Sequence, residues 1–269
     1  MRRTRVGLID SGLGLVSFAA ALHRAAPGLD LLLATDPEHM PYGALEPAQV
    51  QERVLASARA LEPWAPDALV LACNTASVHA LAALRAHAEP EVPVIGTVPA
   101  IKSAARASEA RGGAPFAVWA TSATTASAYQ RELISAFAGS TPVASVACAG
   151  LAQAIERADD AAIDTAIDAA AAATPAHIDS IVLGCTHYGL VAERIRARRP
   201  QTAHLYDSPA AVAAQTLARL GRGAPGAAGG PGGRILAVLA SGRPAGLPRA
   251  LEAYPAGREL LRIAPEQHT

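Results

Sequence analysis

Residues 68–88 read "ALVLACNTASVHALAALRAHA", an apolar run, a cysteine and then an alanine-rich stretch. Residues 68–72 are continuously apolar, which is typical of a strand in a parallel sheet that is covered on both faces. Alanine, leucine and arginine are good helix formers, so a helix is predicted over residues 76–88. The stretch therefore predicts a strand that leads directly into a helix, with Cys73 at the junction.

The same alternation of short apolar runs and longer helical runs extends along the chain. Further helices are predicted over residues 47–64, 159–173 and 191–199. Further strands are predicted at residues 5–9, 30–34, 92–96, 116–120, 142–146, 180–184 and 234–239. Short apolar strands separated by helices indicate an α/β fold with mostly parallel sheets flanked by helices. The glycine- and proline-rich residues 220–234 are predicted to be a flexible surface loop.

Length and composition limit the class of protein. The chain has 269 residues, of which 51% are hydrophobic and 17% charged, so it can bury a core and is not a disordered chain. Its formal net charge is zero, which argues against nucleic acid and against a membrane surface as partners. No apolar run approaches the roughly 20 residues that a membrane-spanning helix needs. Three cysteines in a chain of this length make no disulfide framework, so a cytoplasmic protein with reduced thiols is expected.

A second stretch repeats the setting of Cys73. Residues 181–189 read "IVLGCTHYG", so Cys185 also follows an apolar strand. In both stretches a residue that can cap a helix lies near the cysteine, Thr75 in the first and Thr186 in the second. This weak internal repeat predicts two related α/β halves. Because ligands of open α/β sheets bind beyond the carboxyl ends of the strands, both cysteines are expected at such an edge.

The residues alone leave the role of each cysteine open. A free cysteine at a strand end is more often a buried structural residue than a reactive one. The polar residues after Cys73 and the start of a helix favour its thiolate form, and therefore favour reactivity. His187 is close enough to Cys185 to exchange a proton with it, which fits a Cys–His amidohydrolase but leaves Cys73 unused. A zinc site is disfavoured, because the chain has no C-x-x-C and no H-x-x-x-H pattern.

Polar residues also follow other predicted strands. Asp10 and Ser11 either cap a helix or bind an ammonium group, since an aspartate would repel a phosphate and the P-loop lysine is missing. The loop at residues 34–44 forms either a plain turn or a wall of a site at the same edge. Thr121 and Thr124 are spaced to face one pocket.

Taken in order, these motifs resemble those of the glutamate racemases, which belong to the cofactor-independent aspartate/glutamate racemase superfamily. The motifs are "GLIDSGLG", "TDPEHMPYG", "LACNTAS", "IGTVPAIKSAA", "ATSATTASAYQREL" and "LGCTHYGL", and the resemblance runs from residue 6 to about residue 208. It implies two similar α/β domains with the active site in the cleft between them. The expected domains are residues 1–97 together with 208–269, and residues 98–207.

The resemblance also implies that two cysteines on opposite faces of glutamate remove and return the proton at Cα. Cys73 is then the base toward D-glutamate, and Cys185 is the base toward L-glutamate. Asp10 and His187 resemble the groups that assist the two thiols, and Glu156 is a further catalytic position. The expected substrate-binding residues are Ser11, Asp36, Pro41, Tyr42, Gly43, Asn74, Thr75, Thr121, Thr124 and Thr186.

Three residues depart from the family's pattern. Leu15 stands where the opening D-S-G-x-G-G has its last glycine, so it changes how closely a first helix approaches the site. Ala123 replaces a glycine and is expected to narrow the space above its turn. Ala149 replaces a proline, which leaves Glu156, eight residues after Cys148, assigned by its spacing alone.

The function implied by the resemblance is a cytoplasmic glutamate racemase that uses no cofactor and no metal. Such an enzyme supplies D-glutamate for peptidoglycan and cell-wall biogenesis, and members of the family are often homodimers. An aspartate racemase or another amino-acid racemase of the superfamily is the first alternative. A Cys–His amidohydrolase and a non-catalytic amino-acid-binding module are alternatives of other classes. Two thiols suit racemisation because one must take the proton from one face while the other protonates the opposite face.

Overall fold

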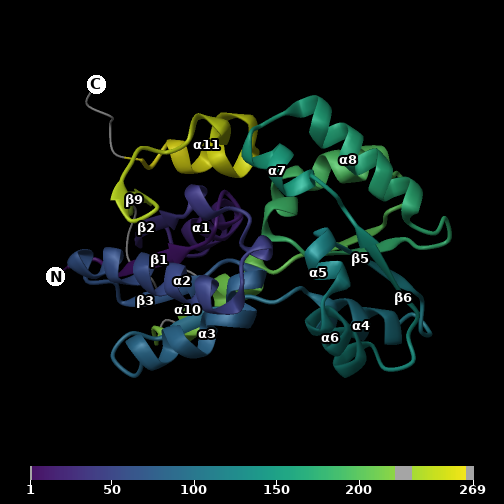
Figure 1. The fold of residues 1–269 in the computed structure, drawn as a ribbon, viewed down its shortest axis with the longest axis horizontal. Helices are drawn as coiled ribbons and strands as arrows, with labels where there is room; N and C mark the ends of the chain where they lie inside the picture. The colour runs from purple at the N-terminus through teal and green to yellow at the C-terminus, as the bar shows by residue number, and fades with distance from the viewer. Residues whose placement is uncertain (1, 222–231, 265–269) are drawn as a thin grey trace. The chain divides into compact units, whose positions relative to one another are not determined.

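The computed structural model describes residues 2–221 and 232–264, and Figure 1 shows its helices and strands. The chain divides into two compact units, a first unit of residues 1–97 with 209–269 and a second unit of residues 98–208. Each unit is a mostly parallel sheet flanked by helices, so the predicted α/β fold is confirmed. Most of the predicted glycine-rich loop lies outside the described residues.

Among the described residues of the first unit, six strands form one sheet. They are β1 (Arg5–Ile9), β2 (Asp30–Thr35), β3 (Ala68–Leu71), β4 (Val94–Gly96), β9 (Ile235–Ala240) and β10 (Arg243–Pro244). Their order is β10-β9-β2-β1-β3-β4, and only β10 runs antiparallel to its neighbour. β1 pairs with β2 on one side and with β3 on the other, so the strand order reverses at β1. In open α/β sheets such a reversal marks the usual ligand site, outside the carboxyl ends of the strands.

Helices cover this sheet. The α-helices are α1 (Leu15–Ala25), α2 (Pro47–Leu61), α3 (Asn74–Ala88), α10 (Pro209–Arg219) and α11 (Pro255–Leu261), and the short 3₁₀ helices are η1 (Pro37–His39), η2 (Tyr42–Ala44), η3 (Glu62–Trp64) and η5 (Arg249–Ala253). α2 packs against α3, while α1 packs against α10 and α11 (Figure 1). Buried side chains of β1, β2, β3 and β9 form one hydrophobic core with side chains of α2 and α3.

The start and end of α2 illustrate how the sequence sets these boundaries. The side chain of Gln49 accepts the Glu46 backbone N–H at 3.0 Å in a capping box, and Pro47 takes the first helical position. One face of the helix is buried, at Val50, Val54, Ser57, Ala58 and Leu61. The predicted helix over residues 47–64 changes to the 3₁₀ helix η3 at its end, where Pro63 has no N–H to continue the α-helical ladder.

The second unit repeats this plan with four strands. They are β5 (Phe116–Ala120), β6 (Val143–Ala147), β7 (Ser180–Leu183) and β8 (His204–Tyr206). Its helices are α4 (Ile101–Glu109), α5 (Ser122–Ala126), α6 (Ala128–Ala138), α7 (Leu151–Glu156), α8 (Asp160–Ala173), η4 (Thr186–Val191) and α9 (Ala192–Arg198). The strand order is β6-β5-β7-β8, all parallel, and it reverses at β5. Over residues 2–221 and 232–264, no helix is long and apolar enough to span a membrane.

The weak internal repeat predicted from the two cysteine stretches is present in the fold. In both units the first strand is central, the second lies on one side, and the third and fourth lie on the other. Cys73 follows the third strand of its unit, and Cys185 follows the third strand of the other. Thr75 and Thr186, which were candidates for helix caps, are not the N-cap residues of these helices. The cysteines themselves occupy the N-cap positions, where their backbone is extended and the next residue begins the helix.

Gly184, between β7 and Cys185, gives a test of this packing. An added Cβ would lie 2.8 Å from the backbone oxygen of Trp119 in β5, which cannot move without displacing the strand. At Gly96, at the end of β4, an added Cβ would meet the flexible side chain of Leu81 at 2.6 Å. We predict that Gly184→Ala lowers the free energy of unfolding by about 1–3 kcal/mol, and by more than Gly96→Ala does. Urea unfolding measures both, and equal losses would contradict this packing argument.

Candidate active site

The loops that follow β1 and β2 meet at one edge of the first unit's sheet. The Asp10 backbone N–H donates to the oxygen of Ala34 at 3.1 Å, and the Asp36 N–H donates to the oxygen of Ser11 at 3.2 Å. Because β3 is parallel to β1, its carboxyl end delivers Cys73 to the same edge. The structure thus brings together the predicted residues of this unit that follow the three strands.

Cys73 stands at the beginning of α3. Its backbone oxygen accepts the Ser77 N–H at 2.9 Å. Cys73 is 6% exposed. Negative charge is favoured at the N-terminal end of a helix, so this position suits a thiolate. Asn74 and Thr75 form the first turn of the helix, where Asn74 is buried and Thr75 is half-buried.

Asp10 and Ser11 are both buried at the end of β1. The Ser11 backbone N–H donates to Oδ1 of Asp10 at 2.6 Å. Burial and the nearby Asp36 raise the pKa of the Tyr42 hydroxyl above its usual range. Cys73 and Asp10 raise the pKa further, so both lie within electrostatic range of the phenol. Tyr42 therefore stays protonated and acts as a hydrogen-bond donor.

The segment Pro41–Gly43 forms the start of η2. The Tyr42 side chain is buried in the same hydrophobic core as Cys73, whereas Pro41 is half-buried and Gly43 is exposed. Among the residues that the structure describes, the backbone N–H groups of Tyr42 and Gly43 have no acceptor. These two donors are available to an anionic group at this edge.

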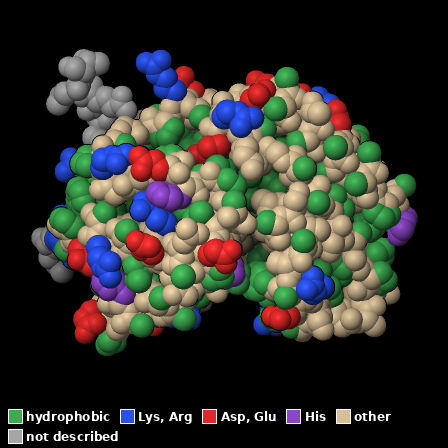
Figure 2. Space-filling model, viewed as in Figure 1, with side chains coloured by type: hydrophobic (Ala, Val, Ile, Leu, Met, Phe, Trp, Pro, Cys, Tyr) green, Lys and Arg blue, Asp and Glu red, His purple; other side chains and the backbone are tan. Residues whose placement is uncertain are grey.

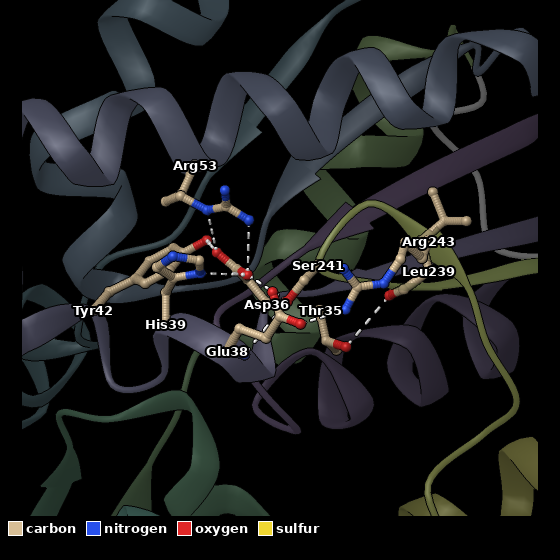
Figure 3. A network of polar contacts seen from close by, with 9 residues as sticks. All are labelled: Thr35, Asp36, Glu38, His39, Tyr42, Arg53, Leu239, Ser241 and Arg243. Carbon is tan, nitrogen blue, oxygen red and sulfur yellow. Dashed lines mark hydrogen bonds and ion pairs between the residues drawn. The ribbon is translucent and has the colours of Figure 1, made fainter.

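Asp36, which is expected to bind substrate, lies in a network of protein donors. Its carboxylate is completely buried and accepts hydrogen bonds from four side chains (Figure 3). Those side chains are His39, Tyr42, Arg53 and Ser241. This geometry favours a positioning role for Asp36 over direct contact with a substrate. Arg53 and Ser241 are not predicted from the sequence, because neither lies in a motif and each meets Asp36 only through the tertiary fold.

In the second unit, Cys185, His187 and Glu156 form a connected set. Nδ1 of His187 lies 3.8 Å from Sγ of Cys185, and Nε2 lies 2.9 Å from Oε2 of Glu156. A carboxylate only accepts, so we assign the hydrogen of the neutral ring to Nε2, and the Nδ1 lone pair then faces the sulfur. The imidazole can accept the thiol proton in this arrangement. Spacing alone had placed Glu156 in the site, and the structure puts it against His187 although Ala149 replaces the family's proline.

Cys148, the third cysteine, is a buried structural thiol. It follows β6, and its backbone N–H donates to the oxygen of Ala120 at 2.8 Å. Burial raises the pKa of its thiol to about 12, and the nearby Cys185 adds to the rise. The hydroxyl of the buried Tyr188 donates to the Cys148 backbone oxygen at 3.4 Å. Cys148 therefore stays protonated near neutral pH and does not act as a base.

Hydroxyl groups complete the edge of the second sheet. Thr121 follows β5, and its Oγ1 accepts the Thr124 backbone N–H at 3.2 Å as the cap of α5. The two threonine hydroxyls lie 3.0 Å apart, so they form a hydrogen bond with each other. Thr186 is buried at the start of η4. Ala123, between these two threonines, is exposed.

Leu15 is the first residue of α1 and is buried, so its side chain joins the core where the family's pattern has a glycine. Among the described residues, no group of three or more His, Cys, Asp and Glu side chains is arranged to hold a metal ion.

Known proteins resemble the chain over most of its length. The profile of the family described as Asp/Glu/Hydantoin racemase matches residues 15–216. A glutamate racemase of Pseudomonas putida strain F1 is 37% identical over 223 residues, which cover 82% of this chain and 83% of the relative. A glutamate racemase of Roseiflexus sp. strain RS-1 is 37% identical over 211 residues, which cover 77% of this chain and 76% of the relative.

Solved structures of glutamate racemases are also similar to this chain. The Escherichia coli glutamate racemase, in complex with L-glutamate and the activator UDP-MurNAc-Ala, has a TM-score of 0.73 and 28% identity, covering 97% of this chain and 94% of that chain. The isoform RacE1 of glutamate racemase from Bacillus anthracis has a TM-score of 0.69 and 27% identity, covering 87% of this chain and 88% of that chain. These matches confirm the resemblance found in the motifs, and the chain belongs to the Asp/Glu/Hydantoin racemase family.

Proposed function

We propose that the protein is a glutamate racemase that interconverts L- and D-glutamate by two-base proton transfer at Cα. The observation that carries this proposal is the pair of cysteines in equivalent places of two similar units, each with its own acid–base neighbours. The choice of glutamate rests on relatives of about one-third identity that are glutamate racemases. In this proposal the thiols of Cys73 and Cys185 act on opposite faces of one glutamate.

The proton transfers follow from this arrangement. In one direction the Cys73 thiolate removes the α-proton of D-glutamate, and the Cys185 thiol protonates the other face to give L-glutamate. This leaves Cys73 as the thiol and Cys185 as the thiolate, which is the starting state of the reverse direction. Before another D-glutamate can react, Cys185 must regain a proton and Cys73 must lose one. Groups of this kind work best when their pKa lies near the operating pH, and cysteine can be tuned to that range.

His187 and Glu156 assist Cys185 in the proposed mechanism. His187 takes the thiol proton through Nδ1, and Glu156 stabilises the resulting imidazolium through the 2.9 Å contact at Nε2. Asp10 is proposed to assist Cys73. Its carboxylate is buried, and both Asp10 and Cys73 lie within electrostatic range of the Tyr42 hydroxyl. Because the groups that assist them differ, the acidities of the two thiols can be adjusted separately.

Neutral donors are proposed to hold the substrate and to stabilise the charge that develops at Cα. The backbone N–H groups of Tyr42 and Gly43 suit a substrate carboxylate. Side-chain donors come from Ser11, Asn74, Thr75, Thr121, Thr124 and Thr186. Such donors, fixed before the reaction and shielded from water, are worth more than they would be in water.

The cellular role is proposed on the same basis. A glutamate racemase acts in the cytoplasm, needs no cofactor and supplies D-glutamate for peptidoglycan synthesis, and we propose a homodimer as its working form. Basic and acidic side chains are interspersed on the face that Figure 2 shows, and the net charge is zero. Both features argue against nucleic acid as a partner.

A hydrolase is the second candidate, because the set of Cys185, His187 and Glu156 has the nucleophile, base and orienting group of a Cys–His enzyme. A hydrolase would release ammonia from an amide substrate and form an acyl group on Cys185. A racemase would change only the configuration at Cα. Chiral chromatography of L-glutamate, L-aspartate and L-glutamine after incubation, with an ammonia assay on the same samples, separates these functions. We expect D-glutamate alone to form.

We predict that Cys73→Ser and Cys185→Ser each abolish racemisation of glutamate, since a serine hydroxyl is far too weak an acid to replace a thiol in either step. Each single variant retains the thiol for one face. It is therefore expected to exchange the α-proton of one isomer only for deuterium from the solvent. NMR of L- and D-glutamate in ²H₂O follows both isomers. Cys148→Ala, which removes the buried structural thiol, is the matched control and is expected to keep racemising. Full interconversion by either serine variant would exclude the two-base proposal.

We predict that Glu156→Gln lowers kcat/KM about 10- to 100-fold, because His187 loses the carboxylate that stabilises its charged form. The equilibrium constant between enantiomers is one, so kcat/KM must fall equally in both directions. The directions differ instead in their isotope effects. The effect of deuterium at Cα should grow for L-glutamate, whose proton Cys185 removes, and shrink for D-glutamate.

The matched control for this prediction is Glu193→Gln, since the Glu193 side chain is exposed and pairs only with Arg196 among the described residues. It is expected to leave both isotope effects unchanged. Equal isotope effects for the two isomers of Glu156→Gln would contradict an assignment of Glu156 to the Cys185 side.

A further inference from the structure

The carboxylate of Asp36 is already saturated with protein donors. Its Oδ1 accepts from Ser241 Oγ at 2.7 Å, Arg53 Nη2 at 3.0 Å and His39 Nδ1 at 3.1 Å. Its Oδ2 accepts from Arg53 Nε at 2.8 Å and from the Tyr42 hydroxyl at 3.0 Å. A carboxylate offers about four lone-pair sites, so no acceptor remains for a substrate ammonium group.

The charge of this buried carboxylate is balanced by Arg53. The guanidinium reaches from α2 and binds both carboxylate oxygens, the planar two-point geometry that arginine alone supplies. Burial by itself would raise the pKa of the Asp36 carboxyl, but the hydrogen bonds it accepts, that of Arg53 first, lower the pKa to about 2. Asp36 is therefore a fixed anion throughout the working pH range.

Ser241 joins the C-terminal hairpin to this anion. It lies in the turn between β9 and β10, where its hydroxyl donates to Asp36 and accepts the Glu38 backbone N–H at 3.3 Å. Its own N–H donates to the oxygen of Thr35 at 2.8 Å. Ser241 has φ of 47° and Gly242 has φ of 79°, a pair that hairpin turns usually build from Asn-Gly or Gly-Gly. A serine adopts this conformation at a cost, so the turn by itself does not account for the hydroxyl.

Tyr42 connects the hydrogen-bond network of Asp36 to the surroundings of Cys73. Its hydroxyl is fixed on Oδ2 of Asp36, and its ring, 1% exposed, packs in the core that contains Cys73. The same residue lies in the segment Pro41–Gly43, whose backbone N–H groups are proposed to bind substrate. Figure 3 shows Arg53 and Tyr42 on one side of the carboxylate and Ser241 on the other.

We propose that Asp36, Arg53 and Ser241 are positioning residues of the reaction, which hold Tyr42 and the Pro41–Gly43 segment in place beside Cys73 without touching the substrate. The kinetic part of this inference rests on the proposed racemase function. The structural part does not, because it concerns contacts within the first unit alone.

Ser241→Gly is the sharpest variant, because glycine accepts the left-handed backbone of the turn and removes only the hydroxyl. We expect a thermal unfolding midpoint within a few degrees of the unchanged protein. We expect kcat/KM for glutamate to fall about tenfold, the effect of losing one hydrogen bond to a charged group. A merely structural serine would leave kcat/KM unchanged in a protein that is equally stable, and that result would overturn the proposal.

The matched controls come from the same elements. Arg243→Gln alters the exposed neighbour in β10, which bonds Glu38 and does not touch Asp36. Arg59→Gln alters an exposed arginine of α2, the helix that carries Arg53. Both are expected to keep full kcat/KM, whereas Arg53→Gln is expected to lose at least as much as Ser241→Gly. Equal losses in the controls would show a general charge effect and would also overturn the proposal.

A double variant tests whether the residues act through one carboxylate. Ser241→Gly combined with Tyr42→Phe is expected to lose no more than the larger single loss, because both remove donors from the same fixed anion. Multiplied losses would mean that the two residues act independently, which contradicts the proposal.

Amide hydrogen exchange separates a failure of this inference from a failure of the racemase proposal. Ala44 and Leu45 donate to the oxygens of Pro41 and Tyr42, and neither bond involves Ser241. We expect both amides to exchange faster in Ser241→Gly, even if the unchanged protein racemises no glutamate. Unchanged exchange at both amides would overturn the positioning role whatever the activity is.

Discussion

One constraint sets the position of each thiol: a parallel strand must lead within two residues to the N-cap of a helix. Cys73 stands at this step with φ of −130° and ψ of 123°, and Cys185 stands there with φ of −129° and ψ of 136°. Because the neighbouring strands are parallel, their loops end at the same edge and supply polar partners. Duplicating the fold therefore duplicates the placement of the thiol, as the proposed reaction at two faces of one carbon requires.

The two devices share a backbone and differ in their neighbours. Cys185 has an imidazole at 3.8 Å that is oriented by the carboxylate of Glu156. Cys73 has the N-terminus of a longer helix, the buried Asp10 nearby and the ring of Tyr42 in its core. The histidine that assists Cys185 is part of the loop that carries this thiol, whereas the groups around Cys73 are held in place from other strands. The network at Asp36 is an example of the arrangement around Cys73.

The sequence predicted those parts of the fold and site that leave a local pattern. Apolar runs located most strands, including the three-residue β4, but β8 and β10 were missed, because β8 begins with a histidine and β10 consists only of an arginine and a proline. The two cysteines that we propose to be reactive were located from their setting after an apolar strand. Arg53 and Ser241 could not be found in this way, since they meet Asp36 across 17 and 205 residues of chain. An arginine in an amphipathic helix and a serine in a turn look like ordinary surface residues until the fold joins them.

The central claim is that the proton leaves one face of glutamate and a different proton arrives on the other. The most direct measurement follows L-glutamate with ordinary hydrogen at Cα in ²H₂O over the first turnovers, by NMR or mass spectrometry of the separated isomers. The two-base account predicts that newly formed D-glutamate carries deuterium at Cα while the remaining L-glutamate does not. D-glutamate that keeps the original proton, or early deuterium in the L-glutamate pool, would contradict it.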